Sequence, residues 1–122
     1  MIIRNSITTP DGTKLVSRYR HDYVSHTDAN GTTYSVDGGL SYLKRAGTTD
    51  YIETSVMSDQ PHSVIREAFE WGTRGIYGDE TLTYIVLKAM STQHIVAVLE
   101  TQEHNPIEVR KVFYNELSWR KC

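Results

Sequence analysis

The sequence predicts an α+β fold, with antiparallel β-hairpins or a meander first and about three helices after them. Residues 1–57 contain short stretches of alternating apolar and polar residues separated by turn sequences, whereas residues 58–122 space their apolar residues as helices do. Strands followed by helices, rather than alternating with them, are typical of α+β proteins. A chain of 122 residues is one domain by size. We therefore expect a single domain over 1–122, with a β-rich half over about 1–57 and a helical half over about 58–122.

Short strands are expected in the β-rich half, because its apolar residues alternate or are β-branched and aromatic. The expected strands cover residues 2–8, 13–20, 21–27, 32–36 and 51–57. Pro10-Asp11-Gly12 should turn the chain after the first strand, and Asn30-Gly31 should close a tight hairpin, because Asn-Gly supplies positive φ. A break is expected near Arg20-His21, since an unbroken strand would be long for so small a domain. Asp37-Gly38-Gly39 should break the ladder, and residues 40–45 could form either a helical turn or a strand extension.

Helix signals dominate the second half. Asp59 is a candidate cap and Pro61 an early helical residue, Gly72 should end the first helix, Ser91 should cap the second, and Asn105-Pro106 should start the third. Between the first two helices, residues 73–79 should be loop and 81–87 a strand or an extended connector. The apolar residues expected to face inward are Val64, Ile65, Ala68, Phe69, Ile95, Val96, Val98, Leu99, Ile107, Val109, Val112, Phe113 and Leu117. A Glu116–Arg120 pair should lie on the outside of the last helix.

The composition argues against several classes of protein. A formal net charge of −2 provides no overall positive field, so binding to duplex nucleic acid or to an anionic membrane is not expected. The apolar runs are far shorter than the roughly 20 residues that span a bilayer. Met1–Asn5 lacks the apolar core of a signal peptide. Cys122, the single cysteine, cannot form an internal disulfide and is expected to be an incidental tail residue, which favours a reducing, cytoplasmic location.

Charged, aromatic and glycine residues concentrate in two blocks on either side of the Asn-Gly hairpin, which should bring the blocks together on adjacent strands. Guanidinium groups bind phosphate in a bidentate manner, tyrosines stack on bases, and the backbone N–H groups of a double glycine can reach a phosphate. Tyr19 and Lys44 add an aromatic ring and a charge to the set. The candidate ligand-binding residues are Arg18, Arg20, His21, Asp22, Tyr23, Asp37, Gly38, Gly39, Tyr42 and Arg45.

The same residues have two other interpretations. They could form a polar network that braces the hairpin, with Asp22 or Asp37 paired to an arginine and His21 hydrogen-bonded in the core. They could also form a catalytic site, in which Asp37 is the better partner for His21 because adjacent strand residues such as His21 and Asp22 point to opposite faces. No Gly-x-Ser-x-Gly, Walker-type or His-Glu-x-x-His pattern occurs, so we expect no catalytic residues and no cofactor, and an enzyme is the weaker reading.

A second candidate site is Trp71, Thr73 and Arg74, where a helix end followed by Thr-Arg-Gly could hold an anion or a carboxylate of a partner. Trp71 could instead be a core anchor and Gly72 a left-handed cap. Histidines 26, 62, 94 and 104 share no spacing and are expected to be surface or capping residues. Tyr114 and Trp119 could form an exposed patch for self-association or belong to the core.

The ordered motifs Arg20-His21-Asp22-Tyr23, Val36-Asp37-Gly38-Gly39, Tyr42-Leu43-Lys44-Arg45 and Trp71-Gly72-Thr73-Arg74-Gly75 resemble a family of small, uncharacterised proteins of bacteriophages and prophages. Some relatives carry Cys-x-x-Cys and Cys-x-Cys pairs, as a zinc ribbon does. This chain has no cysteine in residues 8–12 or 26–31, so no metal site is expected. The resemblance implies a shared hairpin scaffold, a viral origin and the cytoplasm of a host cell.

These observations lead to three hypotheses of function. The first is a non-enzymatic phage accessory protein, active in counter-defence, that sequesters a host nucleotide-type immune messenger, a small anionic ligand, as a homo-oligomer. The second is a phage protein that binds and inhibits or redirects a host protein through its C-terminal helices or the Trp71–Gly75 loop. The third is a small nucleotide phosphohydrolase that acts through His21.

Overall fold

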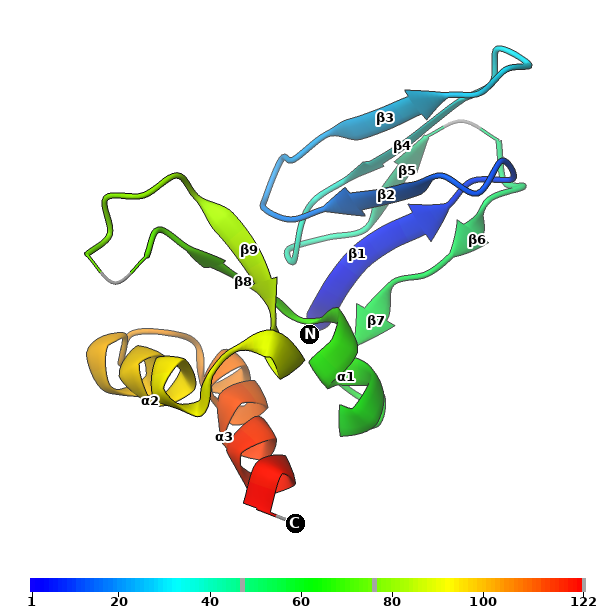
Figure 1. The fold of residues 1–122 in the computed structure, drawn as a ribbon. Coiled ribbons are helices and arrows are strands. Elements are labelled where there is room, and N and C mark those ends of the chain that lie inside the picture. The colour runs from blue at the N-terminus through cyan, green and yellow to red at the C-terminus, as the bar shows by residue number, and fades with distance from the viewer. Residues whose placement is uncertain (47, 76, 122) are drawn as a thin grey trace. The chain divides into compact units, whose positions relative to one another are not determined.

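Strands occupy the first part of the chain and helices the last, so the predicted α+β class is confirmed (Figure 1). The structure, a computed structural model, describes residues 1–46, 48–75 and 77–121. The chain divides into two compact units, Met1–Gln60 and Pro61–Cys122. None of the helices in the described ranges is long and apolar enough to cross a membrane.

The first sheet of the N-terminal unit is built around β1 (Ile2–Thr8). This strand pairs in an antiparallel manner with β2 (Lys14–Ser17), β6 (Ile52–Glu53) and β7 (Val56–Met57). The strand expected over 51–57 is therefore two short strands. The interruption has a local cause, because the hydroxyl of Ser55 accepts the hydrogen bond from the backbone N–H of Ser6 at 3.1 Å. A side chain thus takes the place of a backbone partner.

The second sheet has the order β3 (Val24–Thr27), β4 (Thr33–Asp37) and β5 (Lys44–Ala46). The Asn-Gly hairpin between β3 and β4 is confirmed, with Gly31 at a φ of +81° and its N–H donating to the carbonyl of Asp28 at 3.0 Å. The end of the 40–45 segment extends the sheet as β5, while its beginning is a turn. The break expected near Arg20-His21 is present in the turn that joins β2 to β3, where His21 has a φ of +67°.

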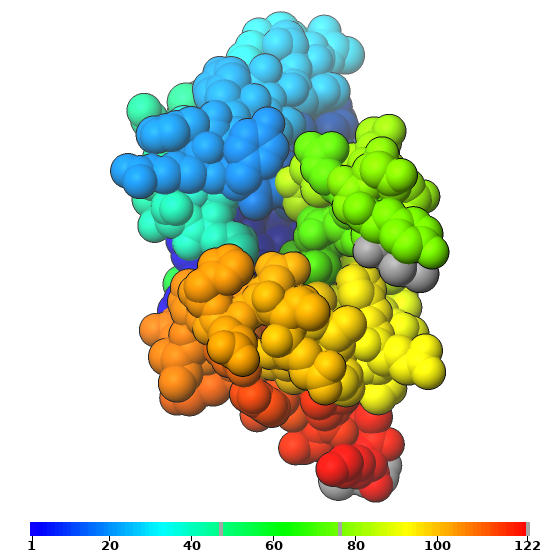
Figure 2. All heavy atoms as spheres, turned by 90° about the vertical axis from the view of Figure 1, so that its left-hand side faces the viewer, coloured from blue at the N-terminus to red at the C-terminus, as the bar shows by residue number. Residues whose placement is uncertain are grey.

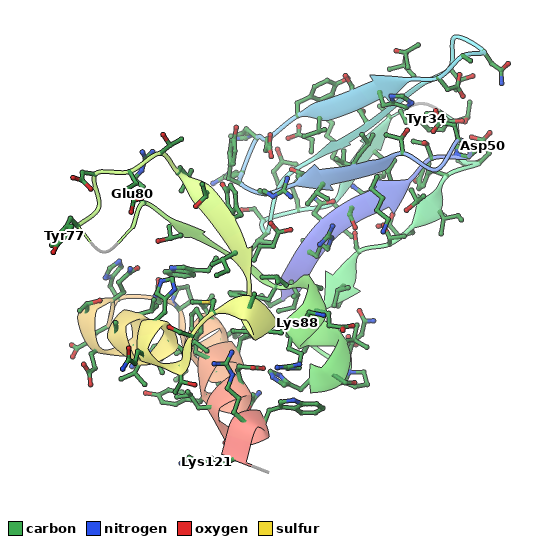
Figure 3. All side chains as sticks on the ribbon, viewed as in Figure 1. Tyr34, Asp50, Tyr77, Glu80, Lys88 and Lys121 are labelled. Carbon is green, nitrogen blue, oxygen red and sulfur yellow. The ribbon has the colours of Figure 1, made fainter. Side chains whose placement is uncertain are left out.

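The core of the N-terminal unit lies between strands of both sheets. Ile7 and Leu15 face each other in the β1–β2 register, and they pack with Tyr34 and Val36 of β4. All four side chains are buried. The Tyr34 hydroxyl donates to the carboxylate of Asp50 at 2.8 Å, and both side chains lie at one end of this unit (Figure 3).

In the C-terminal unit, α1 ends earlier than expected. The elements of this unit, in chain order, are α1 (His62–Ala68), β8 (Glu70–Thr73), β9 (Thr83–Val86), η1 (Leu87–Ala89), α2 (Thr92–Thr101) and α3 (Ile107–Lys121). Gly72 does not end α1, because Phe69 is already extended and Gly72 pairs with Tyr84 in the β8–β9 hairpin. The Asp59 cap is also wrong, since Pro61 holds the cap position and no side chain caps the helix. The strand expected within 81–87 is confirmed as β9.

The other two helices begin as predicted. Ser91 caps α2, its hydroxyl accepting from the backbone N–H of His94 at 3.0 Å. In α3, Val112 and Phe113 are buried, but Ile107 is 70% exposed. Residues of a helix are 100° apart, so Ile107 lies about 140° from Val112 around the axis, whereas Glu116 lies only about 40° from it. Glu116 is therefore buried, and the expectation of an outward Glu116–Arg120 pair is wrong.

Candidate functional site

The two blocks of candidate residues meet in space, most of them in two turns, while Asp37 and Arg45 lie on β4 and β5. The first turn, residues 18–23, joins β2 to β3, and the second, residues 38–43, joins β4 to β5. The two turns lie at the same end of the N-terminal unit (Figure 1), and their blue and turquoise atoms are neighbours on its surface (Figure 2). The backbone of Gly39 lies so close to that of Tyr19 that a β-carbon on Gly39 would clash with it. Nδ1 of His21 is 3.0 Å from the Tyr42 hydroxyl.

The double glycine serves this close packing. The N–H of Gly38 donates to the carboxylate of Asp37 at 2.8 Å, and the N–H of Gly39 donates to the hydroxyl of Ser17 at 2.9 Å. Both glycines have positive φ, +108° and +52°, which side chains with a β-carbon rarely adopt. The two N–H groups are therefore engaged inside the protein and are not available for the phosphate contact expected of them.

Arg45 is a structural residue of this unit. It forms a two-bond contact with Glu53, with Nη2 and Nε donating to the carboxylate at 2.7 and 3.0 Å, and Nη2 also donates to the Ser55 hydroxyl at 3.1 Å. Burial raises the pKa of Glu53, but the hydrogen bonds from Arg45 and Ser55 outweigh it and leave the pKa below its ordinary value. The bracing interpretation therefore describes Arg45, although its acid is Glu53 rather than Asp22 or Asp37.

Asn5 is the residue that sequence reasoning missed. It is fully buried in β1, and its Nδ2 lies 2.9, 3.0 and 3.1 Å from the backbone carbonyl oxygens of Asp37, Gly39 and Tyr42. Its Oδ1 accepts from Arg45 Nη1 at 2.8 Å. Asn5 thus holds the second turn in shape. The sequence did carry a signal, because Asn5 shares the parity of Ile3 and Ile7 and is a polar residue on an otherwise apolar strand face.

The first turn is braced by Asp22 and Ser17. The carboxylate of Asp22 accepts from the backbone N–H of Arg18 at 2.9 Å, and the Ser17 hydroxyl donates to the Asp22 carbonyl at 2.7 Å. His21 has Tyr42 rather than Asp37 as its partner, with ring centroids 6.1 Å apart. Among the described residues, no carboxylate is hydrogen-bonded to the imidazole, and the expected His21–Asp37 pair is not formed.

Several side chains of the two turns remain for an external partner. Tyr19 and Tyr23 are 58% and 61% exposed. Arg20 and Lys44 are exposed, and their side chains make no hydrogen bond or ion pair with the residues that the structure describes. Tyr23 precedes β3 by one residue, so continuing the Val24–Val36 register places it on the same sheet face as Asp37 and Lys44. We call the exposed side chains of residues 18–23 and 38–44 the two-turn surface.

The residues of the second candidate site lie in β8 and in the loop that follows it. Trp71 lies in β8 and packs edge-on against Phe113, with ring centroids 5.3 Å apart, as expected of a core anchor. The Thr73 hydroxyl accepts from the N–H of Gly75 at 3.2 Å, and the Arg74 carbonyl accepts from the N–H of Glu80 at 2.9 Å. Thr73 and Arg74 therefore shape the hairpin tip that carries the labelled Glu80 (Figure 3).

A buried charge cluster in the C-terminal unit was also missed. The carboxylate of Glu116 accepts from His62 Nε2 at 2.9 Å, from Arg66 Nε and Nη2 at 3.0 Å each, and from Arg120 Nε at 2.7 Å. Burial raises the pKa of Glu116, but these hydrogen bonds lower it to about 2. Arg120 also donates to the Met90 carbonyl at 2.7 Å. The cluster ties α1 and the start of α2 to α3, and His62 is part of it instead of a surface residue.

Among the described residues, no group of three or more histidine, cysteine or acidic side chains is placed to hold a metal ion.

Comparison of the chain with protein-family models, with curated proteins and with solved structures gives no significant match in any of the three.

Proposed function

We propose that the protein is a phage accessory protein that acts in counter-defence by binding a host nucleotide-type messenger at the two-turn surface. One observation carries the proposal. Two exposed tyrosines, Tyr19 and Tyr23, lie in the same turn as Arg20, whose guanidinium has no partner among the described residues. The likeness of the sequence motifs to phage proteins supports the viral context.

The chemistry of this surface suits a phosphorylated aromatic ligand. Stacking of a base on an aromatic side chain is worth about 1–3 kcal/mol, and it tolerates any base because every base has a π-face. A guanidinium or ammonium group then neutralises the phosphate, which Arg20 and Lys44 can do without first breaking an internal ion pair. Stacking and charge neutralisation together distinguish a nucleotide from a simple anion.

Residues beneath the two turns support this surface. Asn5, Arg45 and the N–H groups of Gly38 and Gly39 hold the turns in one conformation. Binding residues work best when the residues beneath them are fixed, because less conformational entropy is then lost on binding. The two-turn surface is thus a preorganised platform. It supports binding in preference to catalysis, because His21 is hydrogen-bonded to Tyr42 and to no carboxylate of the described residues.

A host protein is the second candidate partner, and one observation favours it. Leu40 and Leu43 of the second turn are 39% and 45% exposed and accompany the tyrosines and Arg20. Tyrosine and arginine dominate the energetics of protein interfaces, and exposed leucines supply apolar area around them. These exposed side chains favour the N-terminal unit, rather than the C-terminal helices or the Trp71–Gly75 loop, as the surface for such a partner.

A thermal-shift panel tests the proposal. The purified protein is incubated with cyclic dinucleotides, cyclic mononucleotides and ADP-ribose-type nucleotides. A ligand present at 100 times its Kd stabilises the folded state by about 2.7 kcal/mol, which raises the Tm by roughly 10–20 °C for a small domain. Arg20→Ala should lower the affinity about 10- to 100-fold, because one charge-assisted hydrogen bond is lost.

Lys111→Ala is the matched control, since it removes an exposed cation from α3 and leaves both turns intact. Its response should equal that of the wild type. A flat response across the panel would refute nucleotide binding. A stoichiometric host protein recovered equally with wild type and with Arg20→Ala would instead support a protein partner that does not depend on the cation.

A further inference from the structure

His21 is an exception among the left-handed residues of this protein. In the described ranges, positive φ occurs at Gly12, Gly31, Gly38, Gly39, Gly75 and Gly78, and at one residue with a side chain, His21, at +67°. A β-carbon makes this conformation unfavourable, although histidine adopts it more readily than most residues. Glycine would fit this position without strain, so the imidazole lies at a position where the backbone conformation favours a residue without a β-carbon.

Burial does not explain the histidine, because its side chain is exposed. Its hydrogen bond with the Tyr42 hydroxyl is also exposed, and exposed hydrogen bonds contribute little to folding because water competes for both groups. What this bond does fix is the orientation of the ring. With Nδ1 engaged by Tyr42 at 3.0 Å, Nε2 is the nitrogen that remains for an external group. When the Tyr42 hydroxyl donates to Nδ1, the neutral ring carries its proton on Nε2 and presents an N–H donor.

The charges around the ring favour an anion. Arg20 precedes His21, and its side chain has no acidic partner among the described residues. The two nearby carboxylates are both engaged, Asp22 by the backbone N–H of Arg18 and Asp37 by that of Gly38. An N–H donor one residue away from an arginine without an acidic partner among the described residues, with both nearby acids bonded to the backbone, is suited to a phosphoryl oxygen.

We propose that His21 is the specificity-determining residue of the two-turn surface, with Nε2–H donating to a phosphoryl oxygen of the ligand and Tyr42 positioning the ring. The left-handed conformation of His21 serves to bring the imidazole into the two-turn surface. This inference rests on the proposed nucleotide binding. It differs from a bracing role in its prediction for folding, since a brace would be needed for stability and a binding residue would not.

The test combines stability with binding in three variants. His21→Gly relieves the backbone and removes the ring, His21→Asn keeps a residue that tolerates positive φ, and Tyr42→Phe keeps the aromatic ring but not the hydroxyl. The Tm of His21→Gly and His21→Asn should be unchanged or higher than that of the wild type. Their affinity for the nucleotide identified in the panel should fall at least about tenfold, and that of Tyr42→Phe severalfold. In the wild type, millimolar inorganic phosphate should shift the NMR signal of His21 Nε2, and equal acetate should not.

The outcomes separate this inference from the proposed function. If both His21 variants lower the Tm by more than about 5 °C, the residue is a brace and the inference is wrong. If they bind the nucleotide as tightly as the wild type while Arg20→Ala does not, the proposed function stands and the role of His21 is refuted. A wild type that responds to no nucleotide refutes both. A stronger response to a glutamate-rich peptide than to any nucleotide assigns the surface to an acidic protein partner and overturns the inference.

Discussion

Asn5→Asp is the most direct test of how the candidate site is held together. The substitution keeps the shape of the side chain but replaces the Nδ2 group, which lies within 3.1 Å of three carbonyl oxygens, by an oxygen with no hydrogen to donate. Each buried acceptor left without a donor costs about 1–3 kcal/mol, and the two hydrogens of the amide satisfy at least two of these carbonyls. We expect a loss of about 3 kcal/mol or more. A unit of 60 residues has a total stability of only about 3–9 kcal/mol, so the variant should be close to unfolding in this part.

The introduced carboxyl has two opposing influences on its pKa. The three carbonyl oxygens disfavour its charged form, whereas the Arg45 guanidinium, whose Nη1 lies 2.8 Å from Oδ1 of Asn5, favours it. A loss of stability that is larger at pH 8 than at pH 4 would show that the carbonyl oxygens dominate and raise the folded-state pKa, and a loss that is smaller at pH 8 would show that Arg45 dominates and lowers it. Urea unfolding at pH 4 and pH 8 measures this difference, and hydrogen exchange at Gly38 and Gly39 reports the second turn locally.

The matched control is Asn115→Asp, which makes the same chemical change on the exposed side of α3. It should alter the free energy of unfolding by less than about 0.5 kcal/mol. The reasoning fails if Asn5→Asp is as stable as Asn115→Asp, or if Gly38 and Gly39 exchange no faster in the Asn5 variant.

Two further predictions concern stability. Gly39→Ala should destabilise the N-terminal unit by more than about 2 kcal/mol, because residue 39 has a φ of +52° and the new methyl group would clash with the Tyr19 backbone. Gly12→Ala is the control and should cost only about 1 kcal/mol, because residue 12 has a φ of +87° but open space around it. Equal effects of the two substitutions in urea unfolding would contradict the packing of the two turns. The folded-state pKa of Glu116 is lowered to about 2, so its contribution is fully present above the ordinary glutamate pKa and is lost as the pH falls towards 2. Acid unfolding followed by Trp71 and Trp119 fluorescence should show this loss. Glu116→Gln should be less stable than the wild type at pH 7, and its stability should depend less on acid. If the variant has the acid profile of the wild type, Glu116 is not the cause of the acid sensitivity.

The parts of the fold that were predicted correctly depend on local signals. Asn30-Gly31 specifies its hairpin because the reversal needs positive φ at that place, and Ser91 caps α2 because its hydroxyl reaches the N–H of His94, three residues on. Gly72 shows the limit of such signals. Glycine marks both helix ends and close contacts between strands, and here pairing with Tyr84, a residue twelve positions away, decides the matter.

The sequence predicted which segments of the candidate site lie close together, but not the contacts that their residues make. The hairpin brings residues 18–23 and 38–43 together as expected, because a turn of known type fixes which residues of its two strands face each other. Arg45 pairs with Glu53, eight residues away, and with Asn5, 40 residues away. The partners of Glu116 include His62 and Arg66, 54 and 50 residues away. Only the Glu116–Arg120 spacing on one helix was visible beforehand. Contacts between distant segments leave no period in a sequence, and a single chain offers no other trace of them.

The arrangement around Asn5 has a consequence for protein engineering. The second turn does not carry the instructions for its own shape, because three of its carbonyl oxygens converge on an amide nitrogen supplied by a separate strand. A segment of residues 37–45 transplanted onto another scaffold would therefore collapse or open unless the recipient offered a donor at the same point. A transplant into a recipient without such a donor has to bring Asn5 with it, so the smallest portable piece of this surface is discontinuous along the chain.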